Sequence, residues 1–134
     1  METKQVIVIR KDLNMRKGKM VAAGAHASMW ALLDFAHKEQ NGDMTTYTIQ
    51  VHNKSFLWLD QWLLGDYKKI CVSVNSEQEL IDICEQAKAQ DLPYRLQHDI
   101  GLTEFNGVKT VTCCAIGPCP SDIIDAITGK LPLL

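Results

Sequence analysis

The feature that most constrains the fold is a short apolar run that leads into an alanine-rich helix. Residues 5–9 (QVIVI) are apolar and β-branched after the first position, which is typical of a central strand buried on both faces. From residue 19 to about residue 38, small and apolar residues recur at helical spacing, and this periodicity predicts a long helix. A doubly buried strand followed by a helix predicts an α/β fold with helices on both faces of a sheet.

The rest of the chain continues this alternation. We expect further strands at residues 68–74, 94–98 and 108–116, while residues 44–52 fit either a strand or an extended connection. We expect further helices at residues 55–64, 76–90 and 121–128. The order predicts a three-layer α/β/α sandwich with a mixed, about four-stranded sheet. No repeat or linker divides the chain, so residues 1–134 are expected to form a single domain.

Local signals set the expected helix faces and ends. One face of the first helix is predicted to carry Lys19, Ala22, Ala23, His26, Trp30 and Leu33. Ser55 is expected to cap the second helix, Ser76 and Glu79 to form a capping box on the third, and Ser121 to cap the last. The third helix is expected to bury Leu80, Ile81, Cys84 and Ala87. Residues 117–120 (GPCP) are expected to end the preceding strand, and the KLPLL tail to pack back as an edge.

Composition excludes several classes of protein. Hydrophobic residues make up 46% and charged residues 22% of the chain, which is typical of a soluble globular protein. The net charge of −2 excludes a generally cationic binder, so any nucleic-acid contact must come from a local patch. The five cysteines form no CxxC pair, which favours buried thiols in a cytoplasmic protein over disulfides or a zinc site. The chain shows neither a signal peptide nor an apolar run of the ~18 residues that a membrane span needs.

A basic stretch connects the first strand to the first helix. Five of the fourteen lysines and arginines fall within ten positions: Arg10, Lys11, Arg16, Lys17 and Lys19. His26 follows within the helix, seven positions after Lys19, so the two side chains face nearly the same way. Cations at a strand-to-helix junction suit a phosphate-bearing ligand. On spacing alone, however, a solvated loop followed by an ordinary core helix explains the stretch equally well.

Two further polar patches occur at predicted strand ends. Asp99, Thr103 and Glu104 follow the third core strand, and the GPCPS turn precedes the last helix. Ligands of α/β sheets bind at the carboxyl ends of strands. The basic stretch and the Asp99 patch are both expected at such ends. A cation, an imidazole, a carboxylate and a hydroxyl form a plausible hydrolytic set. No serine elbow, Walker loop, dinucleotide fingerprint or HExxH motif is present.

Four segments in order resemble a known family. They are VIVIRKDLNMRKGKMVAAGAHAS, YKKICVSVNSEQEL, DIGLTEF and AIGPCPSDIIDAITGKLPLL, the last of which reaches the chain end. Together they are similar to the second type of peptidyl-tRNA hydrolase, the archaeal and eukaryotic form. The resemblance implies hydrolysis of the ester between a peptide, or an N-blocked aminoacyl group, and the 3′ end of tRNA. It implies attack by water without a cofactor or a metal.

The resemblance also assigns roles to residues. It implies that Lys17, His26, Asp99 and Thr103 are catalytic. Arg10, Arg16, Lys19 and Lys68 are expected to bind the acceptor end of the tRNA, which predicts activity that falls as salt rises. Asp99 with His26 is expected to polarise water, while Lys17 and Thr103 stabilise the oxyanion or hold the ribose and terminal phosphate. A possible homodimer follows from the resemblance and from the apolar helix faces, and the cysteine usage indicates a cytoplasmic location.

The chain departs from the family pattern at several positions. Residues 23–25 are Ala-Gly-Ala where the family has glutamine, cysteine and serine. Leu102 and Glu104 replace an arginine and a glutamine, which lowers the positive charge of that loop by two units. Residues 41–58 match poorly and look like an insert. These changes keep open a non-catalytic RNA- or protein-binding module, and a hydrolase of a smaller ester or amide.

Overall fold

The computed structural model describes residues 2–50, 53–99, 105 and 107–134, with backbone only for residues 53–56. The described strands include a mixed four-stranded sheet in the order β4-β1-β6-β5. Its members are β1 (Thr3–Arg10), β4 (Lys69–Val74), β5 (Tyr94–Asp99) and β6 (Thr110–Pro120). Strand β4 is parallel to β1, whereas β6 is antiparallel to both β1 and β5. The strands β1, β4 and β5 therefore all run in the same direction.

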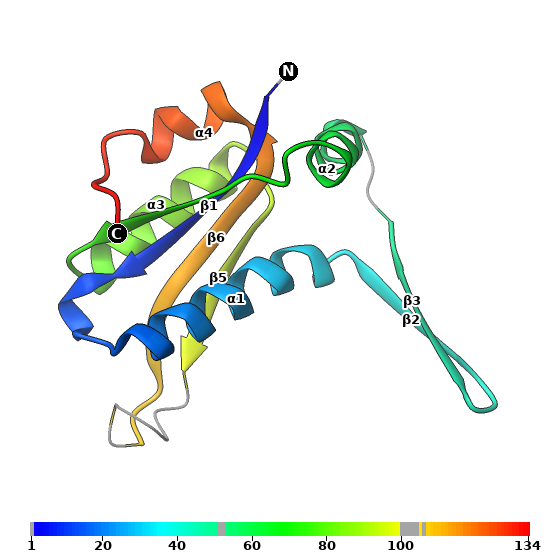
Figure 1. Cartoon of the computed structure of the whole chain (residues 1–134), viewed down its shortest axis with the longest axis horizontal. Helices are drawn as coiled ribbons and strands as arrows, with labels where there is room; N and C mark the ends of the chain where they lie inside the picture. The colour runs from blue at the N-terminus through cyan, green and yellow to red at the C-terminus, as the bar shows by residue number, and fades with distance from the viewer. Residues whose placement is uncertain (1, 51–52, 100–104, 106) are drawn as a thin grey trace.

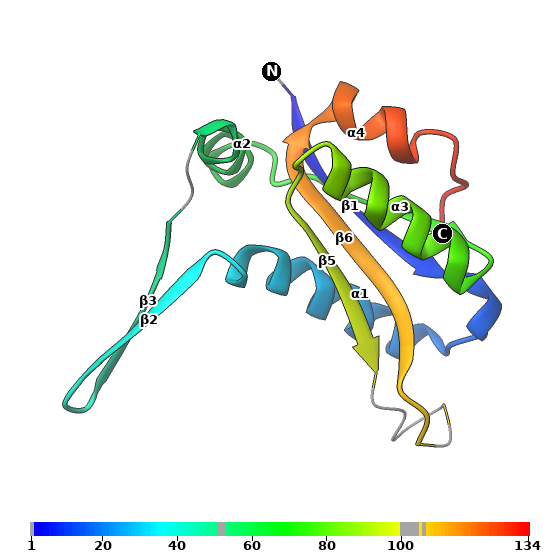
Figure 2. The same ribbon diagram turned by 180° about the vertical axis from the view of Figure 1, so that it is seen from behind.

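Helices cover both faces of this sheet, as predicted. Helix α1 (Lys17–Leu33) crosses one face, while α3 (Glu77–Ala89) and α4 (Ser121–Thr128) lie on the other (Figures 1 and 2). In β1, Val6 and Val8 join the core beneath α3 and α4, whereas Ile7 and Ile9 join the core beneath α1. This alternation follows from the period of two in a strand, and it confirms the three-layer α/β/α sandwich.

Helix α1 packs closely on the sheet through small residues. Its buried positions are Ala23, Gly24, Ala27 and Ala31, which lie over Ile7 and Ile9. The face that spacing predicted borders this buried stripe: Ala23 is buried, whereas Ala22, His26 and Trp30 are exposed. Short side chains let the backbone of α1 lie close to the sheet. The small residues therefore face the sheet, and larger apolar residues such as Val21 and Met29 are exposed.

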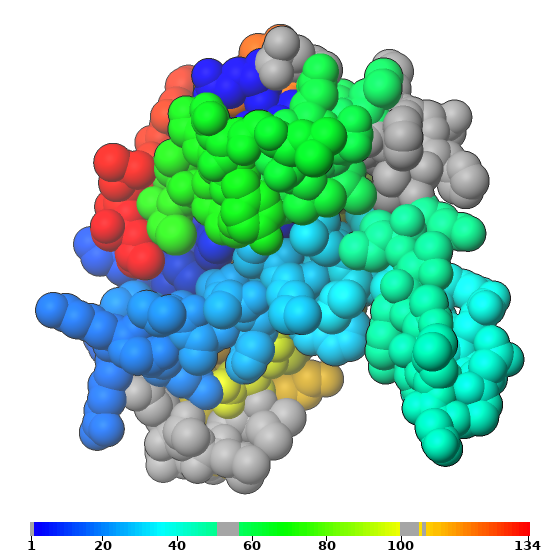
Figure 3. Space-filling view, turned by 45° about the vertical axis from the view of Figure 1, so that its right-hand side comes forward, coloured from blue at the N-terminus to red at the C-terminus, as the bar shows by residue number. Residues whose placement is uncertain are grey.

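The helix also ends earlier than its periodicity predicts. Helix α1 stops at Leu33, and β2 (Ala36–Asn41) pairs with β3 (Met44–Ile49) in an antiparallel hairpin. The hairpin turns at Gly42, whose φ of +60° suits glycine. Figure 3 shows the hairpin projecting from the body of the molecule. The prediction of helix to residue 38 was wrong because cross-strand pairing decides this segment, and residues 44–49 are a strand.

Helix α2 (Asn53–Leu64) begins before Ser55, so the predicted cap at Ser55 was wrong. Its two tryptophans, Trp58 and Trp62, are both buried. The Trp62 indole N–H donates to the carbonyl of Lys68 at 2.8 Å. The one-turn helix η1 (Lys11–Leu13) follows β1. None of the described helices is both long and apolar enough to cross a membrane.

The later helices and strands match the predictions, except for one buried position in α3, the end of β6 and the cap of α4. Ser76 accepts a hydrogen bond from the backbone N–H of Glu79, which confirms the cap of α3, but Ile83 is buried in place of Ile81. Strand β6 continues through Pro120, so the GPCP segment does not end it, and the Ser121 side chain makes no cap hydrogen bond in α4. The tail packs beside β4 as predicted, with Pro132 accepting from the Ser73 N–H at 2.9 Å.

Candidate active site

The sheet brings two of the three predicted polar patches together. Because β1 and β5 run in the same direction, their last residues, Arg10 and Asp99, lie at the same end of the sheet. This end, where β1 and β5 finish, is called the carboxyl edge. Helix α1 begins at this edge as well. The GPCPS segment lies at the opposite edge, since the end of β6 pairs with Thr3 at the start of β1. The arrangement agrees with the general location of ligand sites in α/β sheets.

Lys19 and Asp99 form an ion pair between the first turn of α1 and the end of β5. Their side chains are 19% and 17% exposed, so water and salt screen this pair less than a surface pair. His26 lies two turns further along the same side of α1. Lys19, His26 and Asp99 all line one small cavity of about 20 Å³. An ammonium group, an imidazole and a carboxylate around one cavity can activate and orient water.

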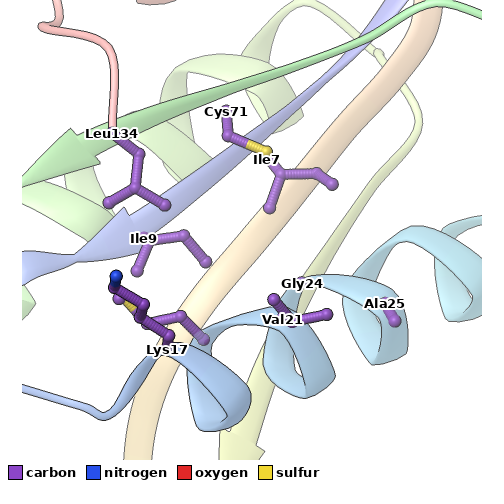
Figure 4. A pocket seen from close by; sticks show the side chains of 9 residues that line it. Ile7, Ile9, Lys17, Val21, Gly24, Ala25, Cys71 and Leu134 are labelled. Atoms are coloured by element: carbon purple, nitrogen blue, oxygen red, sulfur yellow. The ribbon is translucent and has the colours of Figure 1, made fainter.

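Lys17 lies on a different side of α1. Two helical positions correspond to a rotation of about 200°, so Lys17 and Lys19 point to different surfaces. Lys17 lines a mainly apolar cavity of about 410 Å³ together with Ile9 and Leu134. Figure 4 shows the Lys17 side chain at the end of this cavity nearest Ile9 and Leu134. The walls of this cavity provide few polar groups for ester chemistry.

The predicted threonine cannot be placed beside these groups. Thr103 lies outside the described residues, and so do Leu102 and Glu104, where the chain departs from the family pattern. Asp99 is the last described residue before this loop. The geometry above therefore rests on α1 and β5.

Arg10 is occupied by contacts within the chain. Its guanidinium donates to both carboxylate oxygens of Asp12, at 3.1 and 2.7 Å, and to the carbonyl of Val111 at 2.9 Å. The hydrogen bonds and charge of Arg10 lower the pKa of Asp12 despite its partial burial. With a side chain only 11% exposed, Arg10 connects the end of β1 to β6.

The two remaining predicted tRNA-binding residues lie far apart. Arg16 is exposed and precedes the first residue of α1. Lys68 lies just before β4, at the opposite edge of the sheet from Asp99. Its ammonium group donates to Glu2 at 2.9 Å, and this hydrogen bond raises the pKa of Lys68. The structure thus groups Arg16 with Lys17 and Lys19, and separates Lys68 from them.

Three residues that line the small cavity had no role predicted from the sequence. Gln97 and His98 precede Asp99 in β5 and line this cavity together with Thr112 from β6. The available signal was that Gln97 and His98 come directly before Asp99 in a predicted strand. Residues next to a candidate catalytic aspartate lie at the same end of the sheet as the aspartate. Among the described residues, no group of three or more His, Cys, Asp or Glu side chains could hold a metal ion.

The cysteines form part of the core. Cys84, Cys113, Cys114 and Cys119 are buried, Cys71 is exposed, and all five are free thiols. Burial raises the pKa of Cys113 and that of Cys119 to about 12. Thiols with such high pKa values are poor nucleophiles, in agreement with the prediction of buried thiols.

Comparison with known proteins identifies the family. The model of a family described as peptidyl-tRNA hydrolase PTH2 matches residues 3–134. A peptidyl-tRNA hydrolase from Methanocaldococcus jannaschii is 43% identical over 131 residues, covering 98% of this chain and 99% of the relative. One from Metallosphaera sedula is 38% identical with the same coverage, and one from Saccharolobus solfataricus is 36% identical over 135 residues. The chain belongs to the peptidyl-tRNA hydrolase PTH2 family.

Proposed function

We propose that this protein hydrolyses the ester bond between a peptide, or an N-blocked aminoacyl group, and the 3′ end of tRNA, and so recycles tRNA. The observation that carries the proposal is the Lys19–Asp99 ion pair, which lines one cavity with His26 at the carboxyl edge of the sheet. Membership of the PTH2 family supports the reaction and its substrate. Full-length relatives named peptidyl-tRNA hydrolase support it further.

In this proposal, Asp99 and His26 polarise the attacking water. The Lys19 ammonium group fixes the position of the Asp99 carboxylate through their ion pair. Lys17 and Thr103 stabilise the oxyanion or hold the ribose and terminal phosphate of the substrate. Lys17 is exposed at the first turn of α1, and its long alkyl chain lets the ammonium group follow a bound phosphate.

The test is release of the acyl group from N-blocked aminoacyl-tRNA. We expect Lys17→Ala, Lys19→Ala and Asp99→Asn each to lower kcat/KM by about 100-fold or more, the magnitude typical of a lost acid–base or oxyanion group. Lys88→Ala is the matched control, because Lys88 lies in the last turn of α3, on the other side of the sheet. Wild-type turnover in Lys17→Ala would exclude a catalytic role for Lys17.

The tRNA acceptor end is proposed to bind at the start of α1, where Arg16 and Lys17 are exposed. Arg10 and Lys68 are proposed to contribute less, because the Arg10 side chain is only 11% exposed and Lys68 lies before the start of β4, at the opposite end of the strands from Asp99. Arg16→Ala should therefore weaken binding of tRNA more than Lys68→Ala, as measured by filter binding at fixed salt. If Lys68→Ala weakened binding of tRNA more than Arg16→Ala, the tRNA interface would lie beside Lys68, at the start of β4.

The same assay separates this function from the non-catalytic alternative. A binding module would retain tRNA without releasing the acyl group above the uncatalysed rate. The retention of Lys17, His26 and Asp99 supports catalysis instead. We propose that the enzyme works in the cytoplasm, where its substrate arises, and its free thiols agree with a reducing compartment.

We also propose a homodimer. Val21 and Met29, on α1, expose 73% and 63% of their surface beside two cavities that share Ile7 and Ala25. An apolar surface of this kind is typical of protein interfaces. Light scattering should give about twice the mass of the chain, and Met29→Glu should give the monomer mass. A wild-type monomer at micromolar concentration would refute the dimer.

A further inference from the structure

Two buried side-chain atoms within the described part of the chain have no hydrogen-bond partner, and one of them belongs to a residue that lines the active-site cavity. They are Nε of Arg95 and Oε1 of Gln97. Gln97 lines the cavity with Lys19, His26 and Asp99. A buried acceptor without a partner is unfavourable, and in native proteins it usually has a protein group or an ordered water beside it.

The other contacts of Gln97 fix its orientation. Its side-chain Nε2 donates to the carbonyl of His98 at 3.1 Å, and its backbone carbonyl accepts from the Thr112 hydroxyl at 3.4 Å. Exchanging the two ends of the amide would set its oxygen against the His98 carbonyl, so the hydrogen bond specifies Oε1 as the end without a partner. The amide can accept one further hydrogen bond, and its donor must come from elsewhere.

The cavity has the size and the polarity for that donor. Its volume is about 20 Å³, whereas one water molecule requires roughly 10–15 Å³ and between two and four polar partners. The Asp99 carboxylate, the His26 imidazole and the Gln97 amide belong to residues that line it. Water carries two O–H donors, which matches two acceptors, one from an amide and one from a carboxylate.

We propose that Gln97 holds the water molecule that attacks the ester, with the side-chain Oε1 accepting one of its O–H groups. This inference rests on the proposed hydrolytic function and adds a residue to it. The second O–H faces Asp99 or His26, which takes the proton as the water oxygen bonds to the ester carbonyl carbon. The ester C–O bond then breaks, and the ribose 3′ oxygen leaves with the proton that this group took from the water. Gln97 takes no proton and orients the nucleophile.

A crystal structure of the wild-type protein tests the water site directly. At a resolution that shows ordered solvent, we expect electron density for a water within about 3.2 Å of Gln97 Oε1. Because Arg95 precedes Gln97 by two positions in β5, its unpartnered Nε is the competing donor. A Gln97 Oε1 atom bonded to Arg95 Nε, or a dry cavity, would overturn the inference.

Kinetics of Gln97→Met provide the second test. Methionine has nearly the same length and shape but offers no amide oxygen, so the water loses its acceptor. On N-blocked aminoacyl-tRNA we expect kcat to fall about tenfold while KM stays within about twofold, because Gln97 orients water and does not bind tRNA. Gln86→Met, an exposed position of α3, is the control and should leave kcat unchanged. Unchanged kcat in folded Gln97→Met would overturn the inference.

The two tests distinguish this inference from the proposed function. If the wild type hydrolyses N-blocked aminoacyl-tRNA and Gln97→Met does so equally well, the function stands and the role of Gln97 fails. If the wild type releases no acyl group, the function fails and the catalytic role of Gln97 fails with it. The crystallographic water would then show that Gln97 binds solvent without catalysing hydrolysis.

Discussion

At the scale of single residues, Arg10 links three parts of the sequence. It ends β1, donates to Asp12 in the one-turn helix η1, and donates to the carbonyl of Val111 in β6. Hydrogen bonds that involve a charged group contribute about 1.5–3 kcal/mol each when buried. Loss of the Arg10 side chain would leave the Val111 carbonyl without this donor. The cost is expected to be substantial because the Arg10 side chain is only 11% exposed.

We expect Arg10→Met to lower the free energy of unfolding by about 2 kcal/mol at pH 7. The pKa of Asp12 is lowered in the folded protein, so its contribution is complete above the unfolded pKa of about 3.9 and is lost as pH falls through the folded pKa. The difference between wild type and variant should therefore shrink as pH falls below about 4. Urea unfolding at several pH values measures it, and a constant difference would contradict the pairing.

Gly24 offers a second prediction, because an alanine fits where the sequence has glycine. A Cβ at this position would lie 3.5 Å from Cγ2 of Ile7, which is ordinary van der Waals contact. Glycine costs a helix about 1 kcal/mol relative to alanine, so Gly24→Ala should stabilise the protein by up to about that amount. Ala25→Gly, at the exposed neighbouring position, should destabilise it similarly. Thermal unfolding of both variants checks the sign, and destabilisation by Gly24→Ala would contradict the geometry.

The lysines show what could be predicted at this scale. Spacing correctly placed Lys19 and His26 on one side of a helix, and the location of ligand sites at the carboxyl ends of strands pointed to Asp99 and the basic stretch. The Lys19–Asp99 pair itself could not be predicted, because it depends on how α1 lies across β5. The resemblance emphasised Lys17, whose side chain lines the apolar cavity instead. The role of Lys17 remains a prediction.

At the scale of elements, the β2–β3 hairpin has few contacts to retain it. Nearly all its residues are exposed, and an isolated two-stranded hairpin is marginally stable in water. Its ends lie together, since the Gln50 N–H donates to the Phe35 carbonyl at 3.3 Å. Replacing residues 36–49 with Gly-Ser-Gly should therefore change the free energy of unfolding by less than about 1 kcal/mol. Urea unfolding provides the measurement, and a larger loss would show that the hairpin supports the core.

Two elements show where sequence patterns fail. Residues 36–38 continue an apparent helix, but their pairing with residues 47–49 makes them a strand. Residues 117–120 contain two prolines, yet β6 continues because its pairing with β1 shifts register between Lys4 and Val6. A Cβ on Gly117 would lie 2.6 Å from the Lys4 carbonyl oxygen, so this position requires glycine. In both cases the deciding partner lies outside the segment whose periodicity was considered: β3 follows β2 across a turn, whereas β1 lies at the other end of the chain.

At the scale of the whole molecule, the protein is acidic overall and basic at one edge. The net charge is −2, while Arg16 and Lys17 are exposed beside the site. With about two phosphate contacts, the logarithm of kcat/KM should fall against the logarithm of salt concentration with a slope between about −1 and −2. Assays on N-blocked aminoacyl-tRNA from 50 to about 300 mM salt measure this slope. A flat profile would favour the hydrolase of smaller esters.

The position of β6 between β1 and β5 has a consequence during synthesis of the chain. Lys19, His26 and Asp99 all leave the ribosome before residues 110–120, yet β5 contacts β1 only through β6. A nascent chain thus carries these candidate active-site residues without the strand that joins β5 to β1. We expect the enzyme to become active only when β6 has inserted into the middle of the sheet. Incomplete chains of this protein are therefore expected to be inert toward the peptidyl-tRNA that holds them.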